Sequence, residues 1–336
     1  MSIGQLLAVA PTRVDVAAGT GFELLVALAG ASARERGSLD AELREALEAV
    51  GDTAGESWLN LLGIPLDLGA PYSAPRLSRH VAAMEPVELR RHLLGRYAWS
   101  WCTLGGTDTI EAAAAGDAAA ARALLAHDRY YAGRAKAALS TLIRLGPDET
   151  RQRLAKALEM GARLLIDGQD SRLEEAAAAA AAELEAAPLL EAIERATDGY
   201  RYAPEPEAEG VVLIPHVEPE PWLVLAQHRA TRLIVFRARA ERDIEEGVAA
   251  LGRALADPKR VEILGLLARG VDRASELVAR TGLSRSTVHH HLSELREARL
   301  VDLEGNARAY RYLPRPEALA EAQELLSEVF PRRDGA

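Results

Sequence analysis

The chain has 336 residues, enough for about two domains of ordinary size, and a net charge of −10 that argues against unspecific binding to nucleic acid. Its single cysteine, Cys102, excludes an internal disulfide and suits a reducing cytoplasm. No apolar run reaches the ~18–20 residues of a membrane span, and the first residues lack the pattern of a signal peptide. We therefore expect a cytoplasmic protein with no membrane partner.

The first 200 residues predict a helical body that begins with one short strand. Alternation around Val14 and Val16 favours a half-buried strand within residues 1–18. Aromatic residues are only 4% of the chain and alanine is abundant, so helices are expected from Gly21 to about Leu165. The predicted helices include Ile110–Ala126 with a break at Gly116, Tyr130–Arg144, one that starts at Pro147, and Glu174–Ala187 with its end at Pro188.

The composition changes at an acidic, proline-containing connector at residues 203–210. Three apolar or β-branched runs follow it, at Val211–Pro215, Trp222–Gln227 and Arg232–Phe236. Residues 228–231 separate the last two runs in the manner of a hairpin turn. We therefore expect a small antiparallel sheet at residues 201–240, packed on the helical body.

Aromatic residues gather unusually in the helical body, and histidines occur in the predicted sheet. Trp58, Tyr97, Trp99 and Trp101 are candidates for a small-molecule effector pocket, although a helical core explains them as well. His216 and His228 are candidates for a ligand site, against the alternative of hydrogen-bonded residues at strand ends. No spacing indicates catalytic residues, so we expect no enzyme activity and no cofactor.

The most informative pattern lies near the end of the chain and reads as helix, turn, exposed helix and hairpin. Asp257-Pro258 starts one helix, Gly282 ends the next, and Ser284 caps the one that follows. Asp272 is a candidate cap for the short helix between them. Residues 253–315 carry twelve Lys and Arg against eight Asp and Glu, a local charge of +4, while the rest of the chain carries −14. The order predicts a winged helix-turn-helix in an acidic protein.

The helical periodicity separates a buried face of the helix after Ser284 from a face that points to solvent or a DNA groove. Val288, Leu292 and Leu295 form the buried face. The hairpin around Gly305-Asn306 is the predicted wing. Adjacent His289, His290 and His291 point about 100° apart, so we expect no metal site there. The DNA-binding residues predicted from this arrangement are Ser284, Arg285, Ser286, Thr287, His289, His290, Ser293, Arg308 and Arg311.

Residues 245–330 resemble the ArsR/SmtB class of bacterial winged-helix repressors in order and spacing, through Leu-Ala-Asp-Pro-Lys-Arg and Leu-Ser-Arg-Ser-Thr-Val-His-His-His-Leu. The resemblance implies a homodimer that binds double-stranded DNA at an inverted repeat. Arg299 stands where the family usually has glycine, and the Cys cluster of metal-sensing members is missing before the exposed helix. The dimer interface residues that the resemblance implies are Leu251, Leu255, Leu319, Ala322, Leu326 and Val329.

These patterns together predict a mainly α protein with small β elements. The expected domains are a helical sensor or dimerisation domain at 1–200, a small antiparallel β segment at 201–240 and a winged helix-turn-helix at 241–331. The first 200 residues resemble an uncharacterised helical domain of some long ArsR-type regulators, which brings no known activity. The predicted function is a homodimeric transcriptional repressor modulated by a small-molecule effector. The alternatives are a protein-interaction scaffold and an enzyme with a regulatory winged helix.

Overall fold

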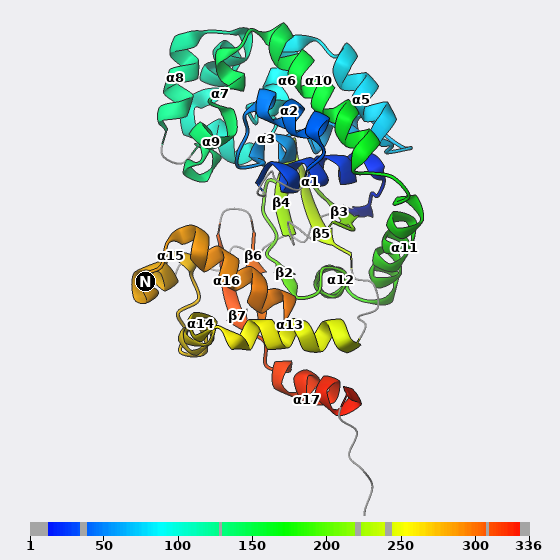
Figure 1. Ribbon diagram of the computed structural model, residues 1–336, viewed down its shortest axis with the longest axis vertical. Coiled ribbons are helices and arrows are strands. Elements are labelled where there is room, and N and C mark those ends of the chain that lie inside the picture. The colour runs from blue at the N-terminus through cyan, green and yellow to red at the C-terminus, as the bar shows by residue number, and fades with distance from the viewer. Residues whose placement is uncertain are drawn as a thin grey trace, which may run out of the picture. The chain divides into compact units, whose positions relative to one another are not determined.

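The computed structural model describes residues 13–33, 39–127, 130–218, 223–238, 244–306 and 309–329, except the side chains of residues 99–106 and 132. The chain forms two compact units (Figure 1). The N-terminal unit comprises Val9–Ala182 and Pro206–Ala238, and the C-terminal unit contains Glu183–Glu205 and the chain from Arg239 onward. The chain therefore passes between the units after Ala182, Glu205 and Ala238, whereas the sequence-based ranges divide it near residues 200 and 240.

Helices make up most of the N-terminal unit, as its composition predicts. Among the described helices, none combines the length and apolar character needed to cross a bilayer. The last of them, α11, continues beyond the end of the unit. In chain order the helices are α1 (Thr20–Ala33), α2 (Ala41–Val50), α3 (Glu56–Leu59), α4 (Gly63–Leu68), α5 (Ala74–Ala83), α6 (Pro86–Leu93), α7 (Trp99–Ala115), α8 (Ala118–Ala126), η2 (Tyr130–Gly133), α9 (Ala135–Leu139), η3 (Leu142–Arg144), α10 (Pro147–Leu164) and α11 (Asp170–Ala186).

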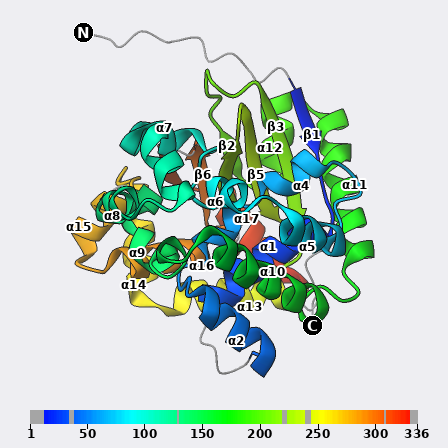
Figure 2. The same ribbon diagram turned by 90° about the horizontal axis from the view of Figure 1, so that it is seen from above.

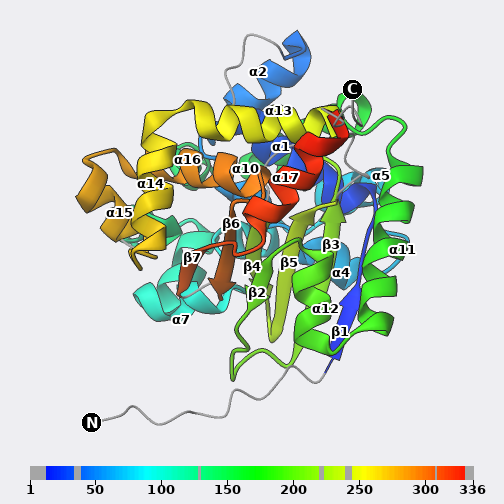
Figure 3. The same ribbon diagram turned by 90° about the horizontal axis from the view of Figure 1, so that it is seen from below.

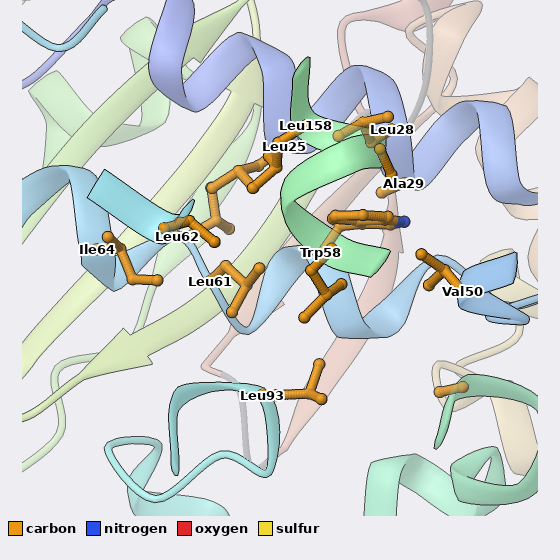
Figure 4. Packing of buried hydrophobic residues seen from close by; sticks show 14 of the residues in the cluster. Leu25, Leu28, Ala29, Val50, Trp58, Leu61, Leu62, Ile64, Leu93 and Leu158 are labelled. Carbon is orange, nitrogen blue, oxygen red and sulfur yellow. The ribbon is translucent and has the colours of Figure 1, made fainter. Parts of the chain in front are cut away.

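Helix α1 is the centre of the N-terminal core. Every residue from Thr20 to Ser32 is buried, so the helix is covered on all sides rather than along one stripe. It contacts α3, α5, α10 and the sheet, and Figure 4 shows Leu25, Leu28 and Ala29 packed near Trp58. The apolar residues of this helix therefore define a core around which the other elements are arranged.

Helix ends follow the local signals in the sequence where those signals are strong. The predicted break at Gly116 is confirmed, because Gly116 has a left-handed φ of 104° after α7, and the Asp117 side chain accepts the first N–H groups of α8. The prediction of one continuous helix over Tyr130–Arg144 is wrong. Left-handed φ values of 54° at Tyr131 and 82° at Gly133 break this stretch into η2, α9 and η3.

The strands of the N-terminal unit form one mixed sheet. They are β1 (Arg13–Val16), β3 (Gly210–His216), β4 (Leu223–His228) and β5 (Thr231–Arg237), in the spatial order β1-β3-β5-β4. The predicted strand in residues 1–18 and the predicted hairpin are confirmed, the latter as the antiparallel pair β4–β5. The antiparallel prediction fails for the other pairs, because β1 and β5 both run parallel to β3. Alternate residues on the central strands, among them Val212, Ile214 and Leu233, belong to the N-terminal core.

The C-terminal unit is a winged helix-turn-helix with an added strand. Its elements are α12 (Leu189–Ala196), β2 (Tyr200–Tyr202), α13 (Ile244–Ala256), α14 (Pro258–Ala268), α15 (Ala274–Thr281), α16 (Arg285–Glu297), β6 (Val301–Gly305), β7 (Tyr310–Pro314) and α17 (Ala318–Val329). The wing hairpin β6–β7 is antiparallel, and β2 pairs with β6 in parallel. A strand that lies between β1 and β3 in the sequence therefore completes the wing.

Candidate nucleic-acid interface

The helix-turn-helix is built from short-range capping bonds. The carboxylate of Asp257 accepts the N–H of Lys259 at 2.7 Å, next to Pro258 in the first turn of α14. Gly282 ends α15 with a left-handed φ of 68°, and the hydroxyl of Ser284 accepts the N–H of Thr287 at 3.1 Å to start α16. These three predicted helix ends are confirmed, and together they fix the turn that orients α16.

The cap predicted at Asp272 is wrong. Arg273 precedes α15, and no side chain caps this helix. Asp272 has another role, because its carbonyl accepts the N–H of Tyr312 on β7 at 2.8 Å. The contact joins the start of α15 to the wing.

Helix α16 has one buried face and one exposed polar face. Val288, Leu292 and Leu295 are completely buried, as the periodicity predicts. The residues predicted to bind DNA at the start of α16 and along it lie outside this buried face. The exposed ones are Ser284, Arg285, Ser286, His290 and Ser293, and the half-buried ones are Thr287 and His289. An exposed polar helix face of this kind fits the major groove of DNA, which admits one α-helix.

Within this face, Ser284 is already engaged in the fold. Its hydroxyl lies 2.9 Å from that of Ser286 and 2.7 Å from that of Thr287, in addition to accepting the backbone N–H. Arg285 and His290 form no such local network in the described contacts of α16. Arg285, His290 and Ser293 are therefore the exposed polar residues of this face that make no hydrogen bond in the described contacts of α16.

His291 belongs to the interior of the unit. It is 6% exposed, and its Nδ1 lies 3.9 Å from the carboxylate of Asp257. Burial lowers the pKa of this imidazole, and the nearby Asp257 opposes that effect. No group of histidines, cysteines and carboxylates that could hold a metal ion occurs within the described ranges.

The wing turns at Gly305, where only glycine fits. Its φ is 134°, and a Cβ there would lie 2.2 Å from the carbonyl oxygen of Ala309. The predicted DNA contact Arg311 is half exposed and donates to the carboxylate of Glu304 from Nε at 3.0 Å. The second predicted wing contact, Arg308, lies outside the described residues. If Arg311 contacts a phosphate, the carboxylate of Glu304 therefore competes with that phosphate for the guanidinium.

Strand β2 braces the wing, a role that sequence analysis missed. Arg201 on β2 donates from Nε to Glu194 at 2.8 Å and from an Nη atom to Asp302 of β6 at 3.1 Å. Burial raises the pKa of Asp302, while the adjacent arginines Arg315 and Arg201 act in the opposite direction. The hydroxyl of Tyr200 also donates to the carbonyl of Gly305 at 2.9 Å. These bonds tie α12 and β2 to the strand that carries the wing.

More arginines lie behind α16, away from its exposed face. Arg296 is 7% exposed, and burial lowers its pKa to about 9. Arg299, which replaces the usual glycine, adopts the left-handed φ of 58° that glycine would favour. Its guanidinium lies 3.4 Å from the carboxylate of Asp198, and that of Arg315 lies 3.8 Å from the same group. These contacts account for an arginine at a position where an L-residue is strained by about 1 kcal/mol.

The predicted dimer residues lie on α13 and α17, which contact each other (Figure 3). Leu251 is buried inside the unit, and Ala322 is half-buried. The other four are large apolar residues open to solvent, with Leu319 81% exposed. They are Leu255, Leu319, Leu326 and Val329.

In the N-terminal unit, the predicted pocket residues have different surroundings. Trp58 is completely buried in the core, and its Nε1 donates to the hydroxyl of Ser32 at 3.0 Å. Tyr97 is half-buried, donates to Glu88, and lies under the guanidinium of Arg229 at 4.8 Å. Side chains of Trp99 and Trp101 lie outside the described residues. Trp58 therefore supports the core reading, while Tyr97 belongs to a polar cluster.

His228 is part of that cluster. Its Nε2 lies 2.9 Å from the carboxylate of Asp67, and its ring stacks on His92 with 5.8 Å between the centroids. Burial and the neighbouring His228 lower the pKa of His92 to about 4, so His92 is neutral at pH 7. His216 is completely buried on β3. His228 thus matches the expectation of a hydrogen-bonded residue at a strand end.

Comparison with known proteins agrees with the geometry of the C-terminal unit. Residues 257–302 match the model described as "Bacterial regulatory protein, arsR family". Over 85 residues the chain is 45% identical to the HTH-type transcriptional regulator CmtR of Mycobacterium tuberculosis. That alignment covers 25% of this chain and 72% of the regulator. Over 101 residues the chain is 34% identical to the HTH-type transcriptional regulator YgaV of Escherichia coli, and this alignment covers 30% of this chain and 97% of YgaV. No solved structure gives a significant match. The chain therefore belongs to the ArsR family of bacterial regulators and carries the DNA-binding helix-turn-helix of that family in its C-terminal part.

Proposed function

We propose that the protein is a homodimeric transcriptional repressor whose N-terminal unit senses a small molecule. The observation that carries the proposal is the exposed polar face of α16, formed by Arg285, Ser286, His290 and Ser293 opposite a fully buried apolar face. In this reading α16 enters the major groove, and the wing contacts the backbone beside it. Two copies of α16 then read the two halves of an inverted repeat.

The apolar residues of α13 and α17 support the dimer. Leu319 and Leu326 are seven residues apart on α17, and both are exposed, as is Leu255 on α13. A second copy would remove these side chains from water at about 25 cal/mol per Å² of apolar surface. An effector would act by changing the spacing of the two α16 helices, which must match half-sites about 34 Å apart.

The direct test is selection of random duplex DNA by the full-length protein, repeated at two salt concentrations. Enrichment of an inverted repeat supports a sequence-specific dimer and gives the half-site spacing. The enriched duplex then serves as a probe for the variant R285A/H290A, for which we expect at least a tenfold loss of specific affinity. The control R122A removes an exposed charge from α8 and should leave affinity within twofold.

Two results would contradict the proposal. Retained specific affinity in R285A/H290A would show that the polar face of α16 does not read the operator. Failure of the folded dimer to enrich any duplex at either salt concentration would favour a protein-interaction role for the winged helix.

A further inference from the structure

A groove on the N-terminal unit runs between α5 and α10, which pack side by side (Figures 1 and 2). It has a volume of about 740 Å³, within the range of sites for small organic ligands. Helix α5 contributes Ser78 and Arg79, and α10 contributes a longer row that includes Arg151, Lys156 and Met160. Both walls are helices of one unit, so the groove does not depend on the placement of the C-terminal unit.

The lining of the groove is positively charged in a chain that is acidic overall. Four cationic residues line it, Arg79, Arg151, Lys156 and Arg163, against the single carboxylate of Glu159. Arg151 and Arg163 are partly neutralised, because Arg151 pairs with Asp148 and Arg163 with Glu42. Among the described residues, no carboxylate lies within ion-pair distance of Arg79 or Lys156. These two cations, one on each wall, are available to an anion.

Buried polar atoms in the lining also lack partners. The Oγ of Ser78 and the Nε of Arg151 are both inaccessible to solvent and have no hydrogen-bond partner within the described chain. An unmade bond at a buried polar atom costs about 1–3 kcal/mol, so a shift of Ser78 or Arg151 that brings either atom to an acceptor in the groove would recover part of that cost. Arg151 is meanwhile held in place by the bond from its Nη1 to the carbonyl of Ala82 at 2.6 Å.

Apart from the amide of Gln152, the remaining lining is apolar, which restricts the class of ligand. The apolar lining includes the small side chains of Ala82 and Ala155 and the flexible side chain of Met160. Methionine adapts its shape to apolar partners of different outline. A bare inorganic anion would leave this surface uncovered, and a neutral apolar compound would leave Arg79 and Lys156 without a counter-charge.

We infer that the α5–α10 groove binds a small organic anion with an apolar body, such as an aryl or acyl carboxylate, sulfonate or phosphate. Arg79 and Lys156 bind the acid group from opposite walls, and the apolar residues cover the body of the molecule. Describing this ligand as the effector rests on the proposed function. The binding site itself does not, and it is tested without DNA.

The probes are 8-anilinonaphthalene-1-sulfonate and its uncharged analogue N-phenyl-1-naphthylamine, titrated into the full-length protein and followed by their fluorescence. We expect the sulfonate to bind at one site at least tenfold more tightly than the analogue. In R79A/K156A its dissociation constant should rise at least tenfold, while that of the analogue stays within twofold. The matched control R122A/K136A removes two exposed cations from α8 and α9 of the same unit and should bind the sulfonate like the wild type.

Equal affinity of the wild type and R79A/K156A for the sulfonate would overturn the inference, as would equal affinity of the wild type for the two probes. Unfolding midpoints from tryptophan fluorescence show that the variants retain the fold. Because no DNA is present, failure here leaves the duplex selection untouched, and failure of that selection leaves this result unaffected.

Discussion

Arg90 on α6 connects several segments of the N-terminal unit, and its removal tests how that unit is stabilised. The residue is 1% exposed. Its guanidinium donates to the carbonyl of Ala113 at 2.8 Å, to the carbonyl of Leu145 at 2.7 Å and to the hydroxyl of Thr150 at 3.1 Å. Burial lowers its pKa, and within the described residues the backbone carbonyls take the place of a carboxylate partner. One side chain therefore joins the end of α7, the segment after η3 and the first turn of α10.

The cost of Arg90→Ala follows from these contacts. A hydrogen bond from a charged donor contributes about 1.5–3 kcal/mol net, and Arg90 makes two short ones. The variant also removes the donor of the Leu145 carbonyl, whereas the Ala113 carbonyl still accepts the N–H of Gly116 at 3.1 Å, and removal of a buried charge offsets part of the loss. We expect the free energy of unfolding to fall by about 3–5 kcal/mol. The control is Arg91→Ala, which breaks ion pairs with Glu88 and Glu111 at a partly exposed position and should cost less than about 1 kcal/mol.

Urea unfolding followed by tryptophan fluorescence measures this difference. All four tryptophans of the sequence fall in the residue ranges of the N-terminal unit, so the signal reports on that unit alone. With a slope of about 1–3 kcal/mol per molar urea, the midpoint of R90A should fall by at least about 1 M. A midpoint of R90A no lower than that of R91A would refute the reasoning, because the buried carbonyl contacts would then contribute no more than surface ion pairs.

Three further predictions concern pH, backbone strain and assembly. Burial raises the pKa of Glu23 from 4.5 to about 7, so the folded unit holds this proton more tightly than the unfolded chain does. The unit should therefore lose up to about 3 kcal/mol of stability as the pH rises from about 4.5 to about 7. Glu23→Gln should abolish this loss in urea midpoints measured from about pH 4.5 to about pH 8. Gly199→Ala places a Cβ 2.2 Å from the carboxylate of Asp302 at a φ of 93°, so amide hydrogen exchange should accelerate in β2 and β6. Gly252→Ala is the control, because a Cβ there has open space around it. Equal exchange rates in the two variants would contradict the predicted strain. Leu319→Glu with Leu326→Glu should turn a dimer into a monomer in sedimentation, and an unchanged dimer would remove α17 from the interface.

The parts of the fold that the sequence predicts well depend on neighbours along the chain. Asp257, Gly282 and Ser284 cap helices through atoms two to four residues away, so their roles can be read without knowing the rest of the fold. The buried face of α16 follows from periodicity for the same reason. Asp272 shows the limit of such reasoning, because a partner on β7, forty residues later, decided its role.

Other features depend on pairings that no local pattern reveals. Strand β2 has three residues, too few for a periodic signal, and its partner on β6 lies about one hundred residues further along the chain. The alternating Tyr200 and Tyr202 are the one available hint. The α5–α10 groove likewise exists because two helices more than sixty residues apart pack together. Trp58 was a candidate for a pocket because it is aromatic, yet the depth of α1 in the core places it inside.

Residues 183–205 belong to the C-terminal unit although they precede β3, so this unit is not one continuous segment that can be cut out of the chain. A fragment that starts at residue 241 would lose β2 and leave one edge of β6 with unpaired N–H and C=O groups. Such an edge is a template for pairing with other chains, and the bonds of Arg201 that hold Asp302 would be lost with it. An engineer who moves this winged helix into another protein must carry the upstream segment along or cover the edge by other means. The isolated fragment should aggregate where the full chain stays dispersed.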